Sequence, residues 1–486
     1  MLLTEKSVRA QGELIGTNLL EYQLGNIPSL RPEYQSSLYD QLNLSYKYKL
    51  FSLQTRIEQY YPSFGDELGY KTISQYRAQY KNKDLAIAVG NIHTTFGKGL
   101  LLRTYEISGS IWEDRGYRIR YGFYKDIEGA EIKYQLGRFK LKGIYGNVLD
   151  VALPPTIENK ERRPDLIQGG ELSYQNKKRT IGAIYMNHKN AATNNHYTAA
   201  YVKTTLFKDF SVYGEFALQS GSGANLAFNN DSAYAAYFSL NYTKNRLGVS
   251  AEIKDYKNFS IGAGITDPPT LVKEHSYKLL NRSTHIPILT YERGYQLEIY
   301  YRFSNGSLIT LNNSLSENKL SDDNSPVFKE FFAEYQFNIG ANVFSHAFVD
   351  YSSDPFTNEN NRYASGFILD IGHNKMNSTV EVQLQFIERE VIEASNFSNM
   401  YFSYTLAIDS KISASALLEI SNDPFLLNTD EKNVLYPGIS FSYKPNYKNS
   451  IQLFYGKRRG GPACNSGVCY DVLDFQGLEL RILSQF

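Results

Sequence analysis

The chain has 486 residues, with 51 basic and 50 acidic side chains and a net charge of +1. This balance gives no electrostatic basis for binding nucleic acid, so no nucleic-acid partner is expected. The mean hydropathy is −0.41, and no apolar run approaches the roughly 18 residues of a membrane-spanning helix. A helical membrane protein is therefore excluded. Aromatic residues nevertheless reach 14%, mostly through 40 Tyr and 28 Phe.

Stretches of about ten residues with alternating apolar and polar side chains recur along the chain, and strands of this length cross a bilayer at a tilt. Residues 40–486 are predicted to form one all-β domain, a transmembrane antiparallel β-barrel. Residues 1–39 are an N-terminal segment, within which Gly12–Gln23 could supply a first strand. Gly99–Tyr105 is a further candidate strand, so the predicted count is 24 to 26.

Two stretches suggest which charges face the inside of the barrel. In Tyr117–Phe123, a predicted wall strand, the aromatic and aliphatic residues alternate with Arg118 and Arg120. Successive side chains of a strand point to opposite faces, so these two arginines are candidate lumen charges.

Tyr295–Phe303 shows the same alternation and adds Glu298 and Arg302 to the candidate lumen charges. Further along, the alternation predicts that Leu384 faces lipid and that Gln383 faces water. Arginine should then be tolerated in place of Gln383 and not in place of Leu384.

Tight polar turns alternate with longer connections, an asymmetry typical of outer-membrane barrels with short periplasmic turns and long extracellular loops. The longest connection, Tyr256–Arg293, is too long and too apolar for an ordinary loop. We expect it to fold into the lumen, with an external cap as the alternative. A barrel of this size is too wide for wall side chains to fill. His93–Trp112 or a partner could also obstruct it, and an open pore is the remaining alternative.

The last stretch, Asp474–Phe486, is predicted to be the strand that closes the barrel, with Leu478, Leu480, Ile482 and Phe486 on its lipid face. The preceding loop is predicted to be extracellular and contains the only two cysteines. Cys464 and Cys469 are predicted to form a disulfide in that oxidising compartment. Two thiolates without a third ligand would make a poor zinc site.

The chain contains no nucleophile motif, and its seven histidines show no metal-ligand spacing. We therefore expect no catalytic residues, no metal, no cofactor and no enzymatic activity.

Two stretches carry a resemblance to a known family: Val89–Glu106 and the glycine-rich Tyr455–Cys469. Together they resemble an uncharacterised family of large outer-membrane barrels of the Bacteroidota, over the chain from about residue 12 to its end. The resemblance implies a barrel fold and an outer-membrane location. It implies no reaction or substrate.

The function predicted is a gated or loop-obstructed conduit for an unidentified solute or polymer. The alternative is a structural or docking subunit of a larger outer-membrane export or assembly complex. The expected partners are outer-membrane lipids and lipopolysaccharide, and, under the alternative, outer-membrane proteins or lipoproteins.

Overall fold

The structure is a computed structural model. The residues that it describes are 12–28, 31–62, 68–114, 118–149, 165–220, 233–259, 261, 271, 273–282, 285, 291–321, 324–390, 394–426, 432–465 and 468–486. No helix among these residues is long and apolar enough to span a bilayer.

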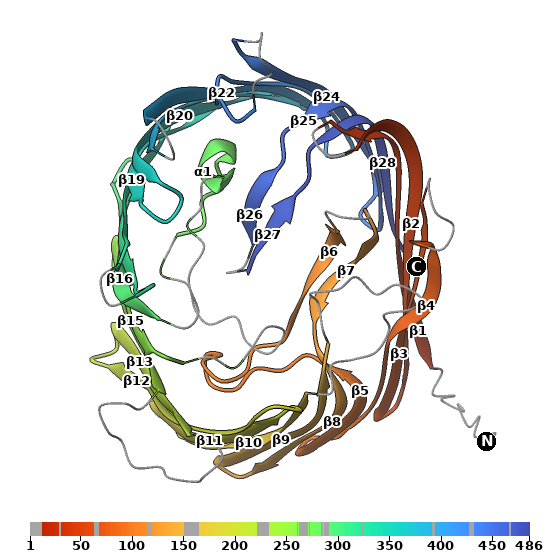
Figure 1. The fold of residues 1–486 in the computed structure, drawn as a ribbon, viewed down its shortest axis with the longest axis vertical. Helices are drawn as coiled ribbons and strands as arrows, with labels where there is room; N and C mark the ends of the chain where they lie inside the picture. The colour runs from red at the N-terminus through yellow and green to blue at the C-terminus, as the bar shows by residue number, and fades with distance from the viewer. Residues whose placement is uncertain are drawn as a thin grey trace, which may run out of the picture.

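Twenty-four strands form one antiparallel sheet that closes on itself (Figure 1). Closure occurs where the first strand, β1, pairs with the last, β28, from Thr17 opposite Gln485 to Asn26 opposite Gln476. The wall strands are β1 (Glu13–Ile27), β2 (Arg31–Tyr48), β3 (Phe51–Tyr61), β4 (Tyr70–Lys81), β5 (Leu85–Ile92), β8 (Ile127–Leu136), β9 (Phe139–Val148), β10 (Leu166–Gln175), β11 (Arg179–Lys189), β12 (Asn194–Leu206), β13 (Phe210–Ser220), β14 (Ala233–Lys244), β15 (Leu247–Lys257), β16 (Glu292–Arg302), β17 (Leu308–Asn318), β18 (Val327–Asn338), β19 (Val343–Asp354), β20 (Glu359–His373), β21 (Met376–Glu390), β22 (Ala394–Ile408), β23 (Ile412–Ser421), β24 (Val434–Asn446), β25 (Asn449–Arg458) and β28 (Phe475–Gln485).

The predicted barrel is confirmed, with 24 strands in its wall. The wall begins earlier than residue 40, because β1 starts at Glu13 and β2 at Arg31. Gly99–Tyr105 adds no wall strand. Tyr117–Phe123 was also misplaced: Arg120–Lys125 forms β7, which pairs only with β6 (Tyr105–Glu113), in a separate two-stranded sheet.

The connections differ sharply between the two ends of the barrel, as the sequence predicts. Two-residue turns at one end include residues 49–50, 245–246 and 447–448. The other end carries the long connections, among them 93–126 and 258–291. Elements from these two connections, and from the one before β28, lie inside the ring of strands (Figure 1).

The side chains of β21 show how the two faces of the wall differ. Leu384 is 50% exposed on the outer face, whereas its neighbour Gln383 points inward and is 0% exposed. The predicted orientation of both is confirmed. Gln383, however, accepts a hydrogen bond from the backbone N–H of Leu279 inside the lumen. It therefore does not face open water, and the expected tolerance to arginine there does not follow.

The end of β28 is held against the start of β1. The backbone N–H of Gly16 donates to the carbonyl of Phe486 at 2.9 Å, and that of Phe486 donates to Gly16 at 3.0 Å. A Cβ at Gly16 would lie 2.2 Å from ring atoms of Phe486, so glycine makes room for the terminal aromatic ring. Glu479 and Arg481 of β28 face the lumen, which puts Leu478, Leu480 and Ile482 on the outer face.

Candidate functional site

The candidate site is the lumen itself, which three stretches of the chain enter (Figure 1). The first stretch supplies two parts, the apolar insert (residues 93–104) and the lumenal hairpin (β6 and β7). The second supplies the tethered segment (residues 273–285, with α1 at Lys278–Arg282), and the third supplies the closing hairpin (β26, Gly461–Asn465, and β27, Val468–Val472). They differ in what holds them to the wall, and that difference determines what each can do.

The apolar insert is held by a hydrophobic core built inside the barrel. Phe96, Leu100, Leu101 and Leu102 are all buried. They pack in one cluster with inward-facing side chains of the wall from β5 to β15. These wall residues are Ile92, Ile127, Ile144, Val148, Ile167, Ile184, Met186, Tyr197, Ala199, Tyr213, Ala217, Ala235, Tyr237 and Tyr256. This side of the lumen is therefore dry, like the interior of a soluble domain.

The backbone of the apolar insert closes on itself. Phe96 N–H donates to the carbonyl of Leu102, and Thr104 N–H donates to that of Thr94, both at 3.0 Å. Gly97 has φ +53°, and a Cβ there would lie 2.5 Å from the Glu215 carboxylate. That carboxylate instead accepts from Lys98 N–H at 2.8 Å. Glycine at this position lets the loop approach β13 closely.

The lumenal hairpin carries Arg118 and Arg120, which lie in the lumen but on this hairpin rather than on the wall. The guanidinium of Arg118 donates to Glu113 at 2.9 Å and to Gln23 of β1 at 3.3 Å. Arg120 is 3.6 Å from both Glu21 of β1 and Glu113. The hairpin thus contacts the wall where the barrel closes.

The tethered segment is held mainly by polar contacts with the far side of the wall. Lys273 pairs with Glu298 of β16, and Arg282 pairs with Glu419 of β23 at 2.8 Å. The N–H of Leu279 donates to Gln383 of β21 at 2.9 Å. These contacts span eight neighbouring wall strands, from β16 to β23.

A small aromatic cluster adds to these contacts. Tyr277 stacks on Phe348 of β19, with ring centroids 3.8 Å apart, and Leu280 belongs to the same cluster. The Tyr277 hydroxyl donates to Glu334 at 2.5 Å. Burial, together with this hydrogen bond to a carboxylate, raises the pKa of Tyr277.

One cation of the segment is poorly compensated. Burial, reinforced by the neighbouring Arg282 guanidinium, lowers the pKa of Lys278 to about 8. Its Nζ atom lies 5.2 Å from the ring centroid of Tyr401. Docking of α1 therefore disfavours the charged form of this lysine.

Two histidines of the tethered segment contact carboxylates of the wall. His285 Nδ1 is 2.8 Å from Asp354 Oδ2, and its Nε2 accepts from the Asn318 amide at 3.2 Å. Both ring nitrogens of His285 therefore have hydrogen-bond partners, which fits a structural role. His275 Nε2 is 3.1 Å from Glu330 Oε1.

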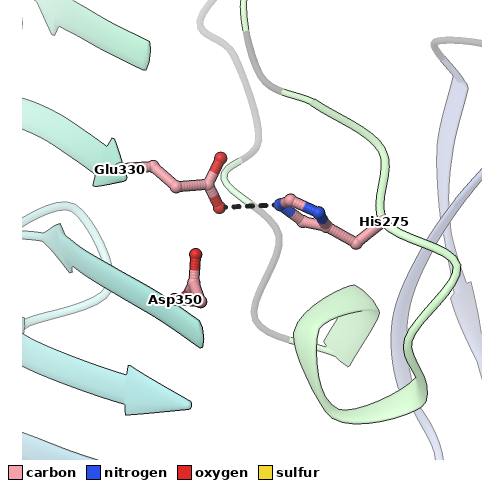
Figure 2. Close-up of side chains that lie close together, drawn as sticks. All are labelled: His275, Glu330 and Asp350. Atoms are coloured by element: carbon pink, nitrogen blue, oxygen red, sulfur yellow. Dashed lines mark hydrogen bonds and ion pairs between the residues drawn. The ribbon is translucent and has the colours of Figure 1, made fainter. Parts of the chain in front are cut away.

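His275 also lies near a second carboxylate, that of Asp350 (Figure 2). One ligand-type atom from each of His275, Glu330 and Asp350 lies within 4.8 Å of the others, and all three residues are buried. Sequence reasoning missed this group because its members are 20 to 75 positions apart. Only the alternation of β18 and β19, which turns both carboxylates inward, could have indicated it.

The remaining predicted residues lie as follows. Glu298 faces the lumen and contacts Lys273. Arg302 is exposed at the short-turn end and donates to the carbonyl of Gly306 at 3.3 Å. Cys464 and Cys469 are backbone partners across the closing hairpin. Their side chains, and so the predicted disulfide, lie outside what the structure describes.

A cavity of about 500 Å³ with a lining of both polar and apolar residues remains beside the apolar insert and the lumenal hairpin. Its lining includes Gln41, Asn43, Arg56, Gln75 and Asn91 from the inner faces of β2 to β5. The lumen is thus not filled evenly: one side is packed with apolar side chains, and another side lines a cavity to which polar residues contribute.

These features define a large outer-membrane-type β-barrel with an occupied lumen. The barrel of the P pilus usher PapC, solved as a translocation pore, has a similar fold, with a TM-score of 0.53 at 8% identity over 97% of this chain and 99% of that one. More distant similarity links the chain to the siderophore receptor PirA from Pseudomonas aeruginosa, with a TM-score of 0.47 at 7% identity over 98% of this chain and 81% of that one. OccK5 (OpdH) from Pseudomonas aeruginosa gives a TM-score of 0.43 at 13% identity over 74% of this chain and 96% of that one.

The particular family is shown by sequence. Residues 27–486 match the model of the family of unknown function DUF6029, and the chain belongs to this family. A search of curated proteins finds no match. At such low identities the structural similarities show a shared fold and do not indicate what this chain binds or transports.

Proposed function

We propose that the protein is a non-enzymatic conduit of the outer membrane and that the tethered segment is its gate. The observation that carries this proposal is the contrast in how the lumen is filled. The apolar insert is fixed by a dry core, whereas the tethered segment is attached largely by ion pairs and hydrogen bonds. Hydrogen bonds and ion pairs lost from the wall can be replaced by contacts with water, so releasing this segment should cost less than exposing the apolar core around the insert.

The polar surfaces of the lumen support a hydrophilic solute. The cavity lining of amides and charged groups offers hydrogen bonds that a polar molecule can use in passing. Acidic and basic residues are both present around it, including Arg56, Arg77 and Glu106. We infer that the conduit does not select strongly by the sign of the charge.

The outer face of the wall supports placement in a lipid bilayer. Large apolar side chains stand exposed around the barrel, among them Ile73, Val89, Ile181, Val349 and Ile439. Exposed apolar bands of this kind meet lipid in outer-membrane barrels. We propose outer-membrane lipids as its direct surroundings, with the long connections on the extracellular side next to lipopolysaccharide.

Deletion tests the gate most directly. Replacing Thr266–Thr284 with a short Gly/Ser bridge should produce a large rise in single-channel conductance in planar bilayers, because it removes α1 and its contacts with the wall. Correct assembly of the variant is checked by the heat-dependent shift of folded barrels in gel electrophoresis. Unchanged conductance in a folded variant would contradict the proposal and favour a docking subunit.

A charge swap provides the matched control. Lys273→Glu places two carboxylates together and should increase the open fraction of the channel. The double variant Lys273→Glu, Glu298→Lys restores opposite charges at the same positions and should return the open fraction toward that of the parent. Equal behaviour of the single and double variants would show that this contact does not hold the gate.

A further inference from the structure

We propose that His275, Glu330 and Asp350 bind a divalent transition-metal cation such as Zn²⁺, which joins the tethered segment to the barrel wall. One imidazole nitrogen and two carboxylate oxygens form a donor set that suits Zn²⁺ and related ions. Ca²⁺ and Mg²⁺ prefer oxygen ligands alone. A latching role for the ion rests on the proposed gate, whereas binding of the ion does not.

The fold brings the three ligands together from three elements. Glu330 is on β18, and Asp350 is on β19 opposite Phe332, two residues from Glu330. Residues two apart on a strand share a face, so both carboxylates point into the lumen. His275 approaches them from the tethered segment (Figure 2). An ion held here would connect a lumenal segment with the rigid wall.

The spacing of the ligands suits a single ion. Metal–ligand bonds of about 2.0–2.2 Å place neighbouring ligands of one ion roughly 3 to 3.5 Å apart. His275 Nε2 and Glu330 Oε1 are already 3.1 Å apart. One ligand-type atom of each of the three residues lies within 4.8 Å of the others, a separation that small side-chain movements can shorten.

The net charge of this group of side chains favours binding of a cation. The only basic group that pairs with both carboxylates among the described residues is Arg362 of β20, 3.4 Å from Glu330 Oε1 and 3.2 Å from Asp350 Oδ1. Two carboxylates beside one guanidinium leave one uncompensated negative charge when His275 is neutral. Buried charge of this kind is unfavourable unless it is paired or binds a metal.

Each of the two carboxylates also has a second oxygen that an ion can use. Glu330 Oε2 and Asp350 Oδ2 have no hydrogen-bond partner among the described residues, although these side chains are only 2% and 4% exposed. Arg362 contacts the other oxygen of each group. Buried acceptors without partners call for an explanation, and a bound cation supplies one.

His275 differs from the other histidine of the segment in a way that fits a ligand. His285 has hydrogen bonds at both ring nitrogens. His275 has one only at Nε2, and its Nδ1 has no partner among the described residues. No hydrogen bond holds Nδ1, so the neutral ring can carry its proton there and leave the lone pair of Nε2, which faces the carboxylates, to bind a metal. A single carboxylate faces His285, which makes it a matched control.

The test uses the full-length barrel, purified in detergent and treated with EDTA. Isothermal titration calorimetry should show one Zn²⁺ per chain, and Co²⁺ should give a ligand-field absorption spectrum. His275→Gln should weaken Zn²⁺ binding roughly tenfold or more, and Glu330→Gln with Asp350→Asn should abolish it. His285→Gln should leave the affinity unchanged.

Three results would overturn the site: no uptake of Zn²⁺ or Co²⁺ by the parent, unchanged affinity in the His275→Gln variant, or Ca²⁺ binding as tight as Zn²⁺. Because His275 lies on the lumenal segment and not on a wall strand, its variant does not depend on refolding an altered wall. A barrel that conducts nothing yet binds Zn²⁺ through these residues would support the site and contradict only the proposed conduit.

Discussion

The apolar insert and the tethered segment occupy opposite sides of one lumen, and they are attached by different forces. Phe96 of the insert is 0% exposed within a cluster of aliphatic and aromatic residues. The tethered segment relies on Lys273, Arg282 and His275, each opposite a carboxylate of the wall. Apolar burial is insensitive to pH and ions, whereas these contacts respond to both. A change of pH or ionic strength is therefore expected to weaken or strengthen the attachment of the tethered segment while the apolar insert stays in place.

The largest effect is expected in the apolar insert. Phe96→Ala should reduce the free energy of unfolding by about 3–5 kcal/mol, because it removes a fully buried ring and leaves a cavity. Denaturant titration followed by tryptophan fluorescence measures this change. Phe207→Ala is the control, since Phe207 is 86% exposed in a turn. A loss below about 1 kcal/mol at Phe96 would mean that the insert is not fixed by its core.

A smaller effect is expected where α1 meets the wall. Gln383→Ala removes the acceptor of the Leu279 N–H, and a buried donor without a partner costs about 1–3 kcal/mol. Hydrogen exchange of the peptide 273–282 should become faster while that of 93–104 stays the same. Gln452→Ala, on an exposed part of the inner wall of β25, should change neither. Faster exchange in both inserts would show that they are coupled and not independent.

The docking of α1 should also depend on pH. The undocked segment carries Lys278 with an ordinary pKa near 10.5, whereas docking lowers the pKa to about 8. Between these values the undocked form binds more protons, so docking strengthens as the pH rises through this window. Exchange rates of peptide 273–282, corrected for intrinsic rates, should show this. Lys278→Met should abolish the dependence and slow exchange at pH 7, and a retained dependence would assign it to another group.

The barrel could be predicted because successive side chains of a strand point to opposite faces. In a membrane barrel one face contacts lipid and the other faces the lumen, so apolar and polar residues alternate along the sequence. The orientations of Leu384 and Gln383 follow from this alternation alone. The alternation shows that the two faces of a strand differ in polarity, but it does not show whether either face contacts lipid, the lumen or another part of the chain. Tyr117–Phe123 has the same alternation, yet β7 lies in the lumen, where its polar side contacts β1 and its aromatic side packs against Trp112.

The lumenal contacts could be predicted only in part. The apolar content of Tyr256–Arg293 indicated that it packs on something, and its described residues 273–282 do lie in the lumen. The wall residues that it contacts could not be predicted. They depend on where the segment lies in the lumen of the closed barrel, and the sequence pattern does not give that position. The expectation of no metal rested on spacing along the chain. His275, Glu330 and Asp350 instead meet through register, which spacing does not report.

The contact between the lumenal hairpin and the closing strands bears on how the chain folds. Gln23 and Glu479, joined at 2.7 Å across the β1–β28 pairing, are 456 residues apart in sequence. Pairing of such distant strands is slow, since a very long loop must close before any contact forms. The hairpin contributes Arg118 and Arg120 to the β1 side of this junction. A docked hairpin would thus hold β1 ready for the last strand to arrive, and it would oppose sideways parting of β1 from β28 once the ring is complete.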